Sequence, residues 1–395
     1  MSVHSFNTSA VQANKSLWSR MTARDSLVRR LDWTLMAAPL VLSALGALLV
    51  WSATRNRTEL TGGDPDQYLF KHLLNAAIGI ALAIAVVWIG HQRLRSVMPV
   101  LYIASVVLVG LVYTPLGATI NGERAWLGVA PGLQIQPSEF VKVTIIIGMA
   151  VILAAKVDAG DREHPDHRTV VQALALAGLP VAVVGDLGQV MVCAVIILGV
   201  LLASGAANRW VLGLLLTGAA GAVAVWVFGL LDQYQLNRFA AFANPALDPS
   251  GVGYNTNQAR IAIGSGGLFG TGLFQGSQTT GQFVPEQQTD FVFTVAGEEL
   301  GFVGGSFILL LLAVILWRAC RIAREATDLY STIIAAGIVA WFAFQSFENI
   351  GMSLGIMPVA GLPLPFVSYG GTAMFAVWIA IGLLQSIRIQ RPMSA

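Results

Sequence analysis

The chain has 395 residues, of which 55% are hydrophobic and only 11% are charged, and its mean hydropathy is +0.70. Soluble domains carry about 25% charged residues, so this composition excludes an ordinary soluble protein and predicts a membrane protein. The net charge of +2 indicates no particular partner, and we expect no nucleic acid. The sequence contains no GxxxxGK[ST] motif, so ATP hydrolysis is not expected.

Apolar segments of about twenty residues recur along the chain and predict about ten transmembrane helices. The first follows about thirty polar and basic residues, is longer than a signal-peptide core, and is expected to remain as an uncleaved span. The spans are predicted at residues 31–52, 69–90, 97–115, 138–155, 169–184, 187–204, 210–231, 291–317, 330–354 and 362–387. The expected fold is therefore an all-α polytopic membrane protein.

Basic residues are distributed unevenly between the two sides of these spans. Most of the 23 Lys and Arg residues fall on the side of the N-terminus, which the positive-inside rule assigns to the cytoplasm. We therefore expect cytoplasmic tails at 1–30 and 389–395 and a single membrane domain at 31–388. The longest loop, at about 232–288 between the seventh and eighth spans, is expected to be extracellular.

The fifth and sixth spans are short, because Pro180, Gly185 and Gly188 interrupt them around Asp186. Interrupted helices in membrane proteins often direct their ends toward a binding site. A tight outer turn in which Asp186 is an ordinary helix cap explains the pattern equally well. Both interpretations stay open.

Charged residues inside predicted spans are costly, by about 2.5–3.5 kcal/mol each, and are therefore functional candidates. Glu139 and Lys142 follow Pro137 and lie three residues apart on one helical face. They form either an internal ion pair or a polar wall of a substrate cavity. Just before them, Arg124 and Trp126 either hold a lipid phosphate or anchor the chain at the membrane interface.

The stretch PEQQTDFVFTVAGEELG brings three acids to the start of the eighth span. Asp290 lies at its outer edge, where it is either a helix cap or a functional carboxylate. Glu298 and Glu299 lie deeper, and we expect them to pair with Lys142 or to support the wall of a cavity.

Two further polar features lie near the end of the chain. Glu348 and Asn349 add polar groups to the ninth span. The Pro-rich loop at 355–371, which contains Ser368, is expected to close the cavity on the outer side.

Several stretches together resemble the SEDS family (shape, elongation, division and sporulation), typified by RodA and FtsW. They are NGERAWL, QIQPSEFVK, GDLG, NPALDPSGVGYNTNQARIAIGSGGLFGTG, PEQQTDFVFTVAGEELGFVGG and MPVAGLPLPFVSYGG. With the predicted spans, they cover nearly the whole chain, and their joint order and spacing are specific. The GLQIQPSEF form of the fourth span resembles the RodA branch more than FtsW.

The chain departs from the family pattern in its outer loops. Val184 and Gly185 stand where Gln-Pro usually precedes DLG, and Gln189 stands where Thr is common. Ala125 occupies the position directly before the Trp, where the family commonly has Arg.

The resemblance implies a peptidoglycan glycosyltransferase that polymerises lipid II, an undecaprenyl-pyrophosphate-linked substrate, on the outer face of the bacterial plasma membrane. The implied partners are a class B penicillin-binding transpeptidase, other proteins of the elongation or division complex, and membrane lipid. By motif position, Asp290 is implied as the catalytic carboxylate. Glu139, Lys142 and Asp186 are implied as supporting residues.

Polymerisation requires a base for the acceptor hydroxyl and cations for the leaving pyrophosphate. We expect Asp290 to be the general base of an inverting displacement. The sequence does not indicate which cation binds the pyrophosphate. It is either a divalent metal ion, Mg²⁺ or Mn²⁺, or one or more of the side chains of Arg124, Lys142, Arg238 and Arg260. The alternatives to a polymerase are a transporter that flips lipid II and a scaffold that only activates the transpeptidase.

Overall fold

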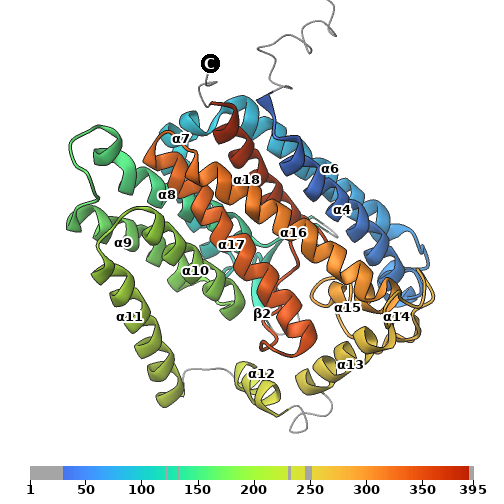
Figure 1. Cartoon of the computed structure of the whole chain (residues 1–395). Helices are drawn as coiled ribbons and strands as arrows, with labels where there is room; N and C mark the ends of the chain where they lie inside the picture. The colour runs from blue at the N-terminus through green and yellow to red at the C-terminus, as the bar shows by residue number, and fades with distance from the viewer. Residues whose placement is uncertain (1–29, 121–122, 131–132, 230–232, 245–250, 391–395) are drawn as a thin grey trace, which may run out of the picture.

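The structure of the chain is a computed structural model that describes residues 30–120, 123–130, 133–229, 233–244 and 251–390. Most of the two predicted tails lies outside these ranges. Both described ends of the chain lie at the same end of a helical bundle (Figure 1). We call it the terminal end, and we call the opposite end, where residues 251–300 gather, the loop end.

Within the described residues, seven helices are long and apolar enough to cross a membrane. They are α4 (Trp33–Thr54), α6 (Gln67–Ile89), α7 (His91–Leu111), α8 (Pro137–Asp158), α16 (Gly301–Arg324), α17 (Leu329–Leu354) and α18 (Gly371–Ile389). The predicted fifth to seventh spans correspond to α9 (His167–Val183), α10 (Leu187–Ala203) and α11 (Asn208–Val227). The all-α polytopic fold is confirmed, and each predicted span contains a helix.

Helices α8, α17 and α18 form the interior of the bundle. Helix α17 packs against α8, α10 and α16, and α18 packs against α6 and α8. In Figure 1, α17 lies between α9–α11 on one side and α4 and α6 on the other. Trp341 of α17 and Trp378 of α18 are completely buried, whereas Trp88 of α6 is 81% exposed, as expected for a side chain that contacts lipid at the membrane interface.

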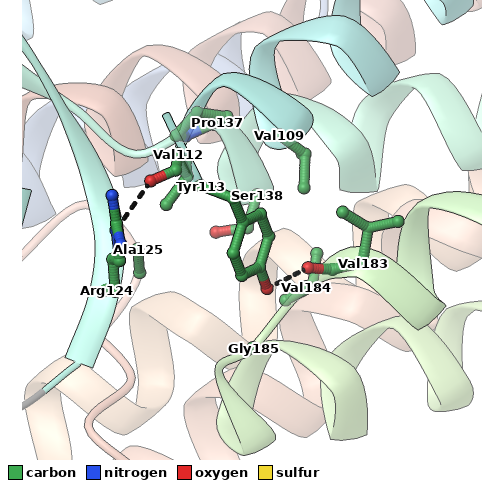
Figure 2. Close-up of a pocket in the computed structure, with 10 residues that line it drawn as sticks. All are labelled: Val109, Val112, Tyr113, Arg124, Ala125, Pro137, Ser138, Val183, Val184 and Gly185. Atoms are coloured by element: carbon green, nitrogen blue, oxygen red, sulfur yellow. Dashed lines mark hydrogen bonds between the residues drawn. The ribbon is translucent and has the colours of Figure 1, made fainter. Parts of the chain in front are cut away.

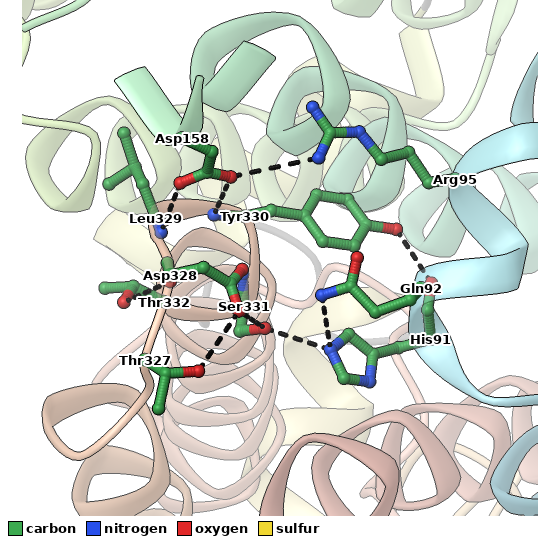
Figure 3. A network of polar contacts seen from close by, with 10 residues as sticks. All are labelled: His91, Gln92, Arg95, Asp158, Thr327, Asp328, Leu329, Tyr330, Ser331 and Thr332. Atoms are coloured by element: carbon green, nitrogen blue, oxygen red, sulfur yellow. Dashed lines mark hydrogen bonds and ion pairs between the residues drawn. The ribbon is translucent and has the colours of Figure 1, made fainter. Parts of the chain in front are cut away.

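A polar network joins α7, α8 and α17 at the terminal end (Figure 3). Asp158, the last residue of α8, accepts hydrogen bonds from the backbone nitrogens of Leu329 (2.8 Å) and Tyr330 (3.3 Å) at the start of α17. The Tyr330 hydroxyl donates to the His91 carbonyl oxygen at the start of α7 (3.2 Å). Because the first N–H groups of a helix have no partner within the helix, Asp158 stabilises the start of α17 and fixes it to α8.

A three-stranded antiparallel sheet lies between α7 and α8, where the sequence predicts only an interfacial loop. Its strands are β1 (Gly117–Ile120), β2 (Glu123–Ala130) and β3 (Leu133–Ile135), in the order β1-β2-β3. The strands are too short to show a clear alternating pattern. Their pairing satisfies backbone groups that have no helix to satisfy them.

The predicted eighth span, residues 291–317, is not one helix. Helix α15 (Val292–Glu299) ends before α16 begins at Gly301, whose φ is +65°, a conformation that glycine adopts without strain. A Cβ at Gly301 would lie 2.2 Å from the Gly270 backbone nitrogen, so a neighbouring loop occupies that space. The prediction of a continuous helix is therefore wrong here, and the three acids of this stretch precede the spanning helix.

The predicted long loop at 232–288 is largely helical in its described part. It contains α12 (Gln233–Ala243), α13 (Val252–Ser265) and α14 (Ser277–Thr280), and the short α5 (Thr58–Thr61) links α4 to α6. Helix α13 packs against α15 and α17. This loop is therefore part of the packed loop end of the bundle.

The tenth predicted span corresponds to α18, which begins at Gly371 and not at residue 362. Pro363 and Pro365 precede it; proline lacks the N–H group that a helix interior needs and restricts the residue before it. Residues 355–370 consequently form an irregular connection between α17 and α18, which we call the proline-rich segment.

Replacing Gly301 by Ala is expected to destabilise the protein, because the new methyl group meets Gly270 and the backbone conformation disfavours a side chain. We expect a loss of more than about 1 kcal/mol, detected as a lower melting temperature of the detergent-purified protein. Gly110→Ala is the matched control, since no described atom beyond its own helix and chain neighbours lies within 4 Å of the added methyl group. Equal melting temperatures for the two variants would contradict this account of the helix break.

Candidate active site

Asp290 lies two residues before the start of α15 and is half-buried. A tight turn holds it, in which the Glu286 carbonyl oxygen accepts hydrogen bonds from the backbone nitrogens of Thr289 (3.2 Å), Asp290 (3.0 Å) and Phe291 (3.3 Å). Glu286 has a φ of +47°, a conformation that costs a non-glycine residue about 1–3 kcal/mol. The surrounding packing therefore imposes this turn and, with it, the place of Asp290.

The proline-rich segment brings a basic side chain to Asp290. Its Gly361 has a φ of +69°, and a Cβ on this residue would lie 3.5 Å from Asp290 Oδ2 and 3.6 Å from Arg238 Nη2. Arg238, on α12, is only 7% exposed. A carboxylate and a guanidinium that are far apart in sequence, both among the predicted site residues, thus lie close to the same glycine.

A further acid, Glu348 of α17, is buried near this point. It is 0% exposed, and the backbone of Ala360 in the proline-rich segment lies beside its carboxylate. The charges of Asp290, Arg238 and Asp186 all act on it. The sequence predicts Glu348 only as an extra polar group of the ninth span, although an acid inside a span is itself a signal of function.

Asp186 is the N-cap of α10. Its Oδ1 accepts hydrogen bonds from the backbone nitrogens of Gly188 (2.8 Å) and Gln189 (3.3 Å). A Cβ at Gly188 would lie 2.5 Å from the Ala360 carbonyl oxygen, so this helix end lies against the proline-rich segment. Asp186 is therefore a helix cap, as one interpretation of the interrupted spans predicts. The helix end that it caps also lies against the proline-rich segment near Gly361, as the other interpretation predicts.

Glu139 and Lys142 form the internal ion pair that was one of the two predicted alternatives. Lys142 Nζ lies 2.8 Å from Glu139 Oε2, and both side chains are 0% exposed. Gln189 Nε2 donates to Glu139 Oε1 (2.7 Å), and Lys142 Nζ donates to Gln345 Oε1 (3.1 Å). These hydrogen bonds satisfy the buried charges, which is necessary because a buried ion without partners is strongly destabilising.

Two amide side chains of α17 hold the proline-rich segment against the bundle. Gln345 Nε2 donates to the Pro363 carbonyl oxygen (2.7 Å), and Asn349 Nδ2 donates to the Leu362 carbonyl oxygen (2.7 Å). The two amides are four residues apart and therefore lie on one helical face. They connect the core helix α17 to the residues that follow Gly361.

Glu298 and Glu299 do not pair with Lys142, and that alternative is wrong. Glu298 accepts hydrogen bonds from the backbone nitrogens of Gln278 (2.7 Å) and Thr279 (2.9 Å) and from the Thr279 hydroxyl (2.7 Å). Glu299 Oε1 accepts from the Ser52 hydroxyl (2.6 Å). Because α15 ends before the spanning helix begins, its acids face α14 and α4 and support the fold of the loop end.

Arg124 lies in a different place from Asp290, at a small pocket between β2 and the ends of α7, α8 and α9 (Figure 2). Its Nε donates to the Val112 carbonyl oxygen (3.0 Å) and its Nη2 to the Thr114 carbonyl oxygen (2.8 Å). The hydroxyl of Tyr113 donates to the Val183 carbonyl oxygen across the same pocket (2.6 Å). Arg124 therefore attaches the sheet to α7, and the structure does not bring it to Gly361.

Arg260 and Ser368 also make backbone contacts. Arg260 donates from Nε to the Leu354 carbonyl oxygen (3.1 Å) and from Nη2 to the Gly355 carbonyl oxygen (3.0 Å), which closes the end of α17. The Ser368 hydroxyl accepts a hydrogen bond from the Leu364 backbone nitrogen (2.8 Å) and shapes the proline-rich segment. The described residues contain no group of three His, Cys, Asp or Glu side chains that could hold a metal ion.

Residues 32–392 match the family of cell cycle proteins that comprises FtsW, RodA and SpoVE. The chain belongs to this family. It is 36% identical over 363 residues to stage V sporulation protein E of Bacillus subtilis (strain 168), which covers 90% of this chain and 96% of that protein. It is 32% identical over 382 residues to peptidoglycan glycosyltransferase MrdB of Escherichia coli (strain K12), which covers 96% and 97%.

Other members are equally similar. The chain is 33% identical over 362 residues to the probable peptidoglycan glycosyltransferase FtsW of Aeromonas salmonicida (strain A449), which covers 90% of both proteins. Since FtsW and MrdB relatives lie at nearly the same identity, the RodA branch stays a prediction. Membership of the SEDS family, predicted from the motifs, is confirmed.

Two of the solved structures that share the fold illustrate the similarity. One is the rod shape determining protein RodA of Thermus thermophilus, with a TM-score of 0.64 and 27% identity, which covers 92% of this chain and 98% of that one. The other belongs to a peptidoglycan synthase complex that coordinates polymerization and crosslinking, with a TM-score of 0.74 and 29% identity, which covers 92% and 99%.

Replacing Lys142 by Met is expected to destabilise this SEDS protein by about 3–5 kcal/mol, because the buried carboxylate of Glu139 loses its counter-charge. Adding Glu139→Gln should restore much of the loss, since the charge without a partner is then removed. Melting temperatures of the three detergent-purified proteins give the comparison. A double variant no more stable than Lys142→Met alone would show that charge pairing is not the stabilising interaction.

Proposed function

We propose that this chain polymerises lipid II at the outer face of the bacterial plasma membrane, with Asp290 as the general base. The chain is a SEDS peptidoglycan glycosyltransferase that acts in cell elongation or division. The observation that supports the assignment of the base is that Asp290 Oδ2 and Arg238 Nη2 both lie close to Gly361. A carboxylate and a cation near one residue of the loop end are the two groups that the reaction needs.

The reaction joins a sugar hydroxyl of one lipid-linked chain to the anomeric carbon of another. As the new C–O bond forms, the hydroxyl proton passes to the Asp290 carboxylate. The bond between the anomeric carbon and the pyrophosphate breaks, and its electron pair leaves with the pyrophosphate. Because this is a single displacement, the configuration at the anomeric carbon inverts. A positioned base of this kind typically contributes 10²- to 10⁴-fold in rate.

Arg238 is the predicted cation best placed for the developing negative charge. It lies beside Asp290 at Gly361, whereas the contacts of Arg124 and Arg260 are with backbone carbonyl oxygens. Lys142 is buried in its pair with Glu139. A guanidinium in a largely water-excluded position stabilises a pyrophosphate oxygen more strongly than it would in water.

The setting of this site follows from the charge pattern. We place both tails, 1–30 and 389–395, in the cytoplasm and treat 31–388 as a single membrane domain, which puts the loop end outside. The proposed partners are a class B transpeptidase, other proteins of the elongation or division complex, and membrane lipid. A similar chain in a peptidoglycan synthase complex that coordinates polymerization and crosslinking supports the transpeptidase.

Asp290→Asn is expected to lower the polymerisation rate by about 10²-fold or more, because an amide cannot accept the hydroxyl proton. The measurement is glycan strand formation from labelled lipid II by the purified protein with its transpeptidase, with melting temperature as the check on folding. Glu59→Gln, which neutralises an exposed acid on α5, is the matched control and should leave the rate unchanged. Normal polymer from a folded Asn variant would remove Asp290 from the mechanism.

Arg238→Gln is expected to lower the rate by about 10²-fold, since the leaving group loses its cation. Arg238→Lys should retain more activity than Gln, because lysine keeps the positive charge although it loses the fork of donors. Rates of polymerisation at saturating lipid II distinguish the two variants. Equal rates for the Lys and Gln variants would show that the positive charge of Arg238 does not contribute to the rate. Arg238 would then have a packing role, and another cation would stabilise the pyrophosphate.

A further inference from the structure

The side-chain amide of Asn349 donates hydrogen bonds to two separate segments of the candidate site. The residue is 0% exposed, and its Nδ2 donates to the Asp290 carbonyl oxygen (2.7 Å) as well as to the Leu362 carbonyl oxygen (2.7 Å). An amide nitrogen carries two hydrogens, so each carbonyl oxygen receives one. One side chain therefore connects the backbone of Asp290 directly to the proline-rich segment.

The two carbonyl oxygens belong to the segment that carries Asp290 and to the proline-rich segment, and the distance between these segments sets the geometry of the proposed site. Asp290 carries the carboxylate, and Leu362 directly follows Gly361, around which the carboxylate and Arg238 meet. Helix α17 is the rigid element in this arrangement, because it lies in the interior of the bundle and packs against α8, α10 and α16. Any rotation of the Asp290 backbone or shift of Gly361 would lengthen one of the two hydrogen bonds.

Neighbouring residues of α17 show what is particular to Asn349. Gln345, one turn earlier, donates from Nε2 to the Pro363 carbonyl oxygen of the proline-rich segment, and its Oε1 accepts hydrogen bonds from Lys142 and Trp341. The Ser346 hydroxyl is buried and has no hydrogen-bond partner within the described residues. Among these three polar side chains, only that of Asn349 contacts the backbone of Asp290.

We propose that Asn349 is a positioning residue for the glycosyl transfer. It holds the Asp290 carboxylate in register with Arg238 and Gly361, and it acts through Asp290 without touching substrate. This inference depends on the proposed role of Asp290 as the base. A displacement of about 1 Å at a reacting group can cost about 10²-fold in rate, so the loss of one tether at this place has a large effect on turnover.

The kinetic signature follows from this role. Asn349→Ala removes both donors, and Asn349→Asp keeps the size of the side chain while replacing the donating nitrogen by an oxygen. We expect kcat to fall about 10- to 100-fold in each variant, while KM for lipid II changes less than about threefold, because substrate binding is not what the amide supports. Ser346→Ala, which removes a buried polar group from the same helix, is the matched control and should leave both constants unchanged.

A double-variant test separates positioning from a general effect on the fold. Asp290→Glu retains a carboxylate but displaces it by one methylene, so the tether no longer sets its productive place. We expect Asn349→Ala to cost several-fold less in the Asp290→Glu background than in the wild type, which is the non-additivity of residues that act as a unit. Equal fold-losses in the two backgrounds would overturn the proposal.

Polymerisation of labelled lipid II, binding of labelled lipid II and melting temperature are measured for each purified variant with the transpeptidase present. Unchanged kcat in folded Asn349→Ala, a loss confined to KM, or failure of both Asn349 variants to fold would each overturn the positioning role. The proposed base is tested separately, because Asp290→Asn alone decides it. An inactive Asp290→Asn together with a fully active Asn349→Ala would reject only the inference about Asn349.

Discussion

The irregular connection between α17 and α18 depends on hydrogen bonds from the side chains of α17. Backbone groups at membrane depth must find partners within the protein, because lipid offers none. Here Gln345 and Asn349 supply two carbonyl oxygens of the proline-rich segment with donors, and the Ser368 hydroxyl accepts from Leu364 within it. A core helix thereby supports a segment that has no regular structure and that carries Gly361 to Asp290.

Two groups of charged side chains in the bundle have different roles. Glu139 and Lys142 neutralise each other, and both are completely buried, so this pair supports the packing of α8 against α10 and α17. Asp290 is half-buried and lies with Arg238 at the loop end. The second group is the more exposed of the two, which is the physical reason for proposing that the chemistry takes place there and not at the buried pair.

Much of the fold could be predicted from the sequence, because apolar length and the position of prolines are local properties. Each predicted span contains a helix, and the pairing of Glu139 with Lys142 follows from a three-residue spacing. The break at Gly301 could not be predicted, since it depends on a loop more than thirty residues earlier in the sequence that occupies the space of a side chain. The partners of Arg124 and Arg260 are backbone carbonyl oxygens, and no sequence pattern indicates which carbonyl a long side chain will reach.

The helix break determines how the acid that we propose as the base is held at the start of the eighth span. In a continuous helix, Asp290 would share the rigid axis of the membrane span, and its position would be set by packing against lipid and neighbouring helices. Because α15 ends before Gly301, Asp290 belongs instead to a short unit held by the Glu286 turn, by the contacts of Glu298 and Glu299, and by Asn349. Each of these contacts comes from a different element of the loop end, so the carboxylate is fixed relative to the proline-rich segment and to Arg238. The acids that the sequence shows as three similar charges thus divide into one that faces the site and two that hold it in place.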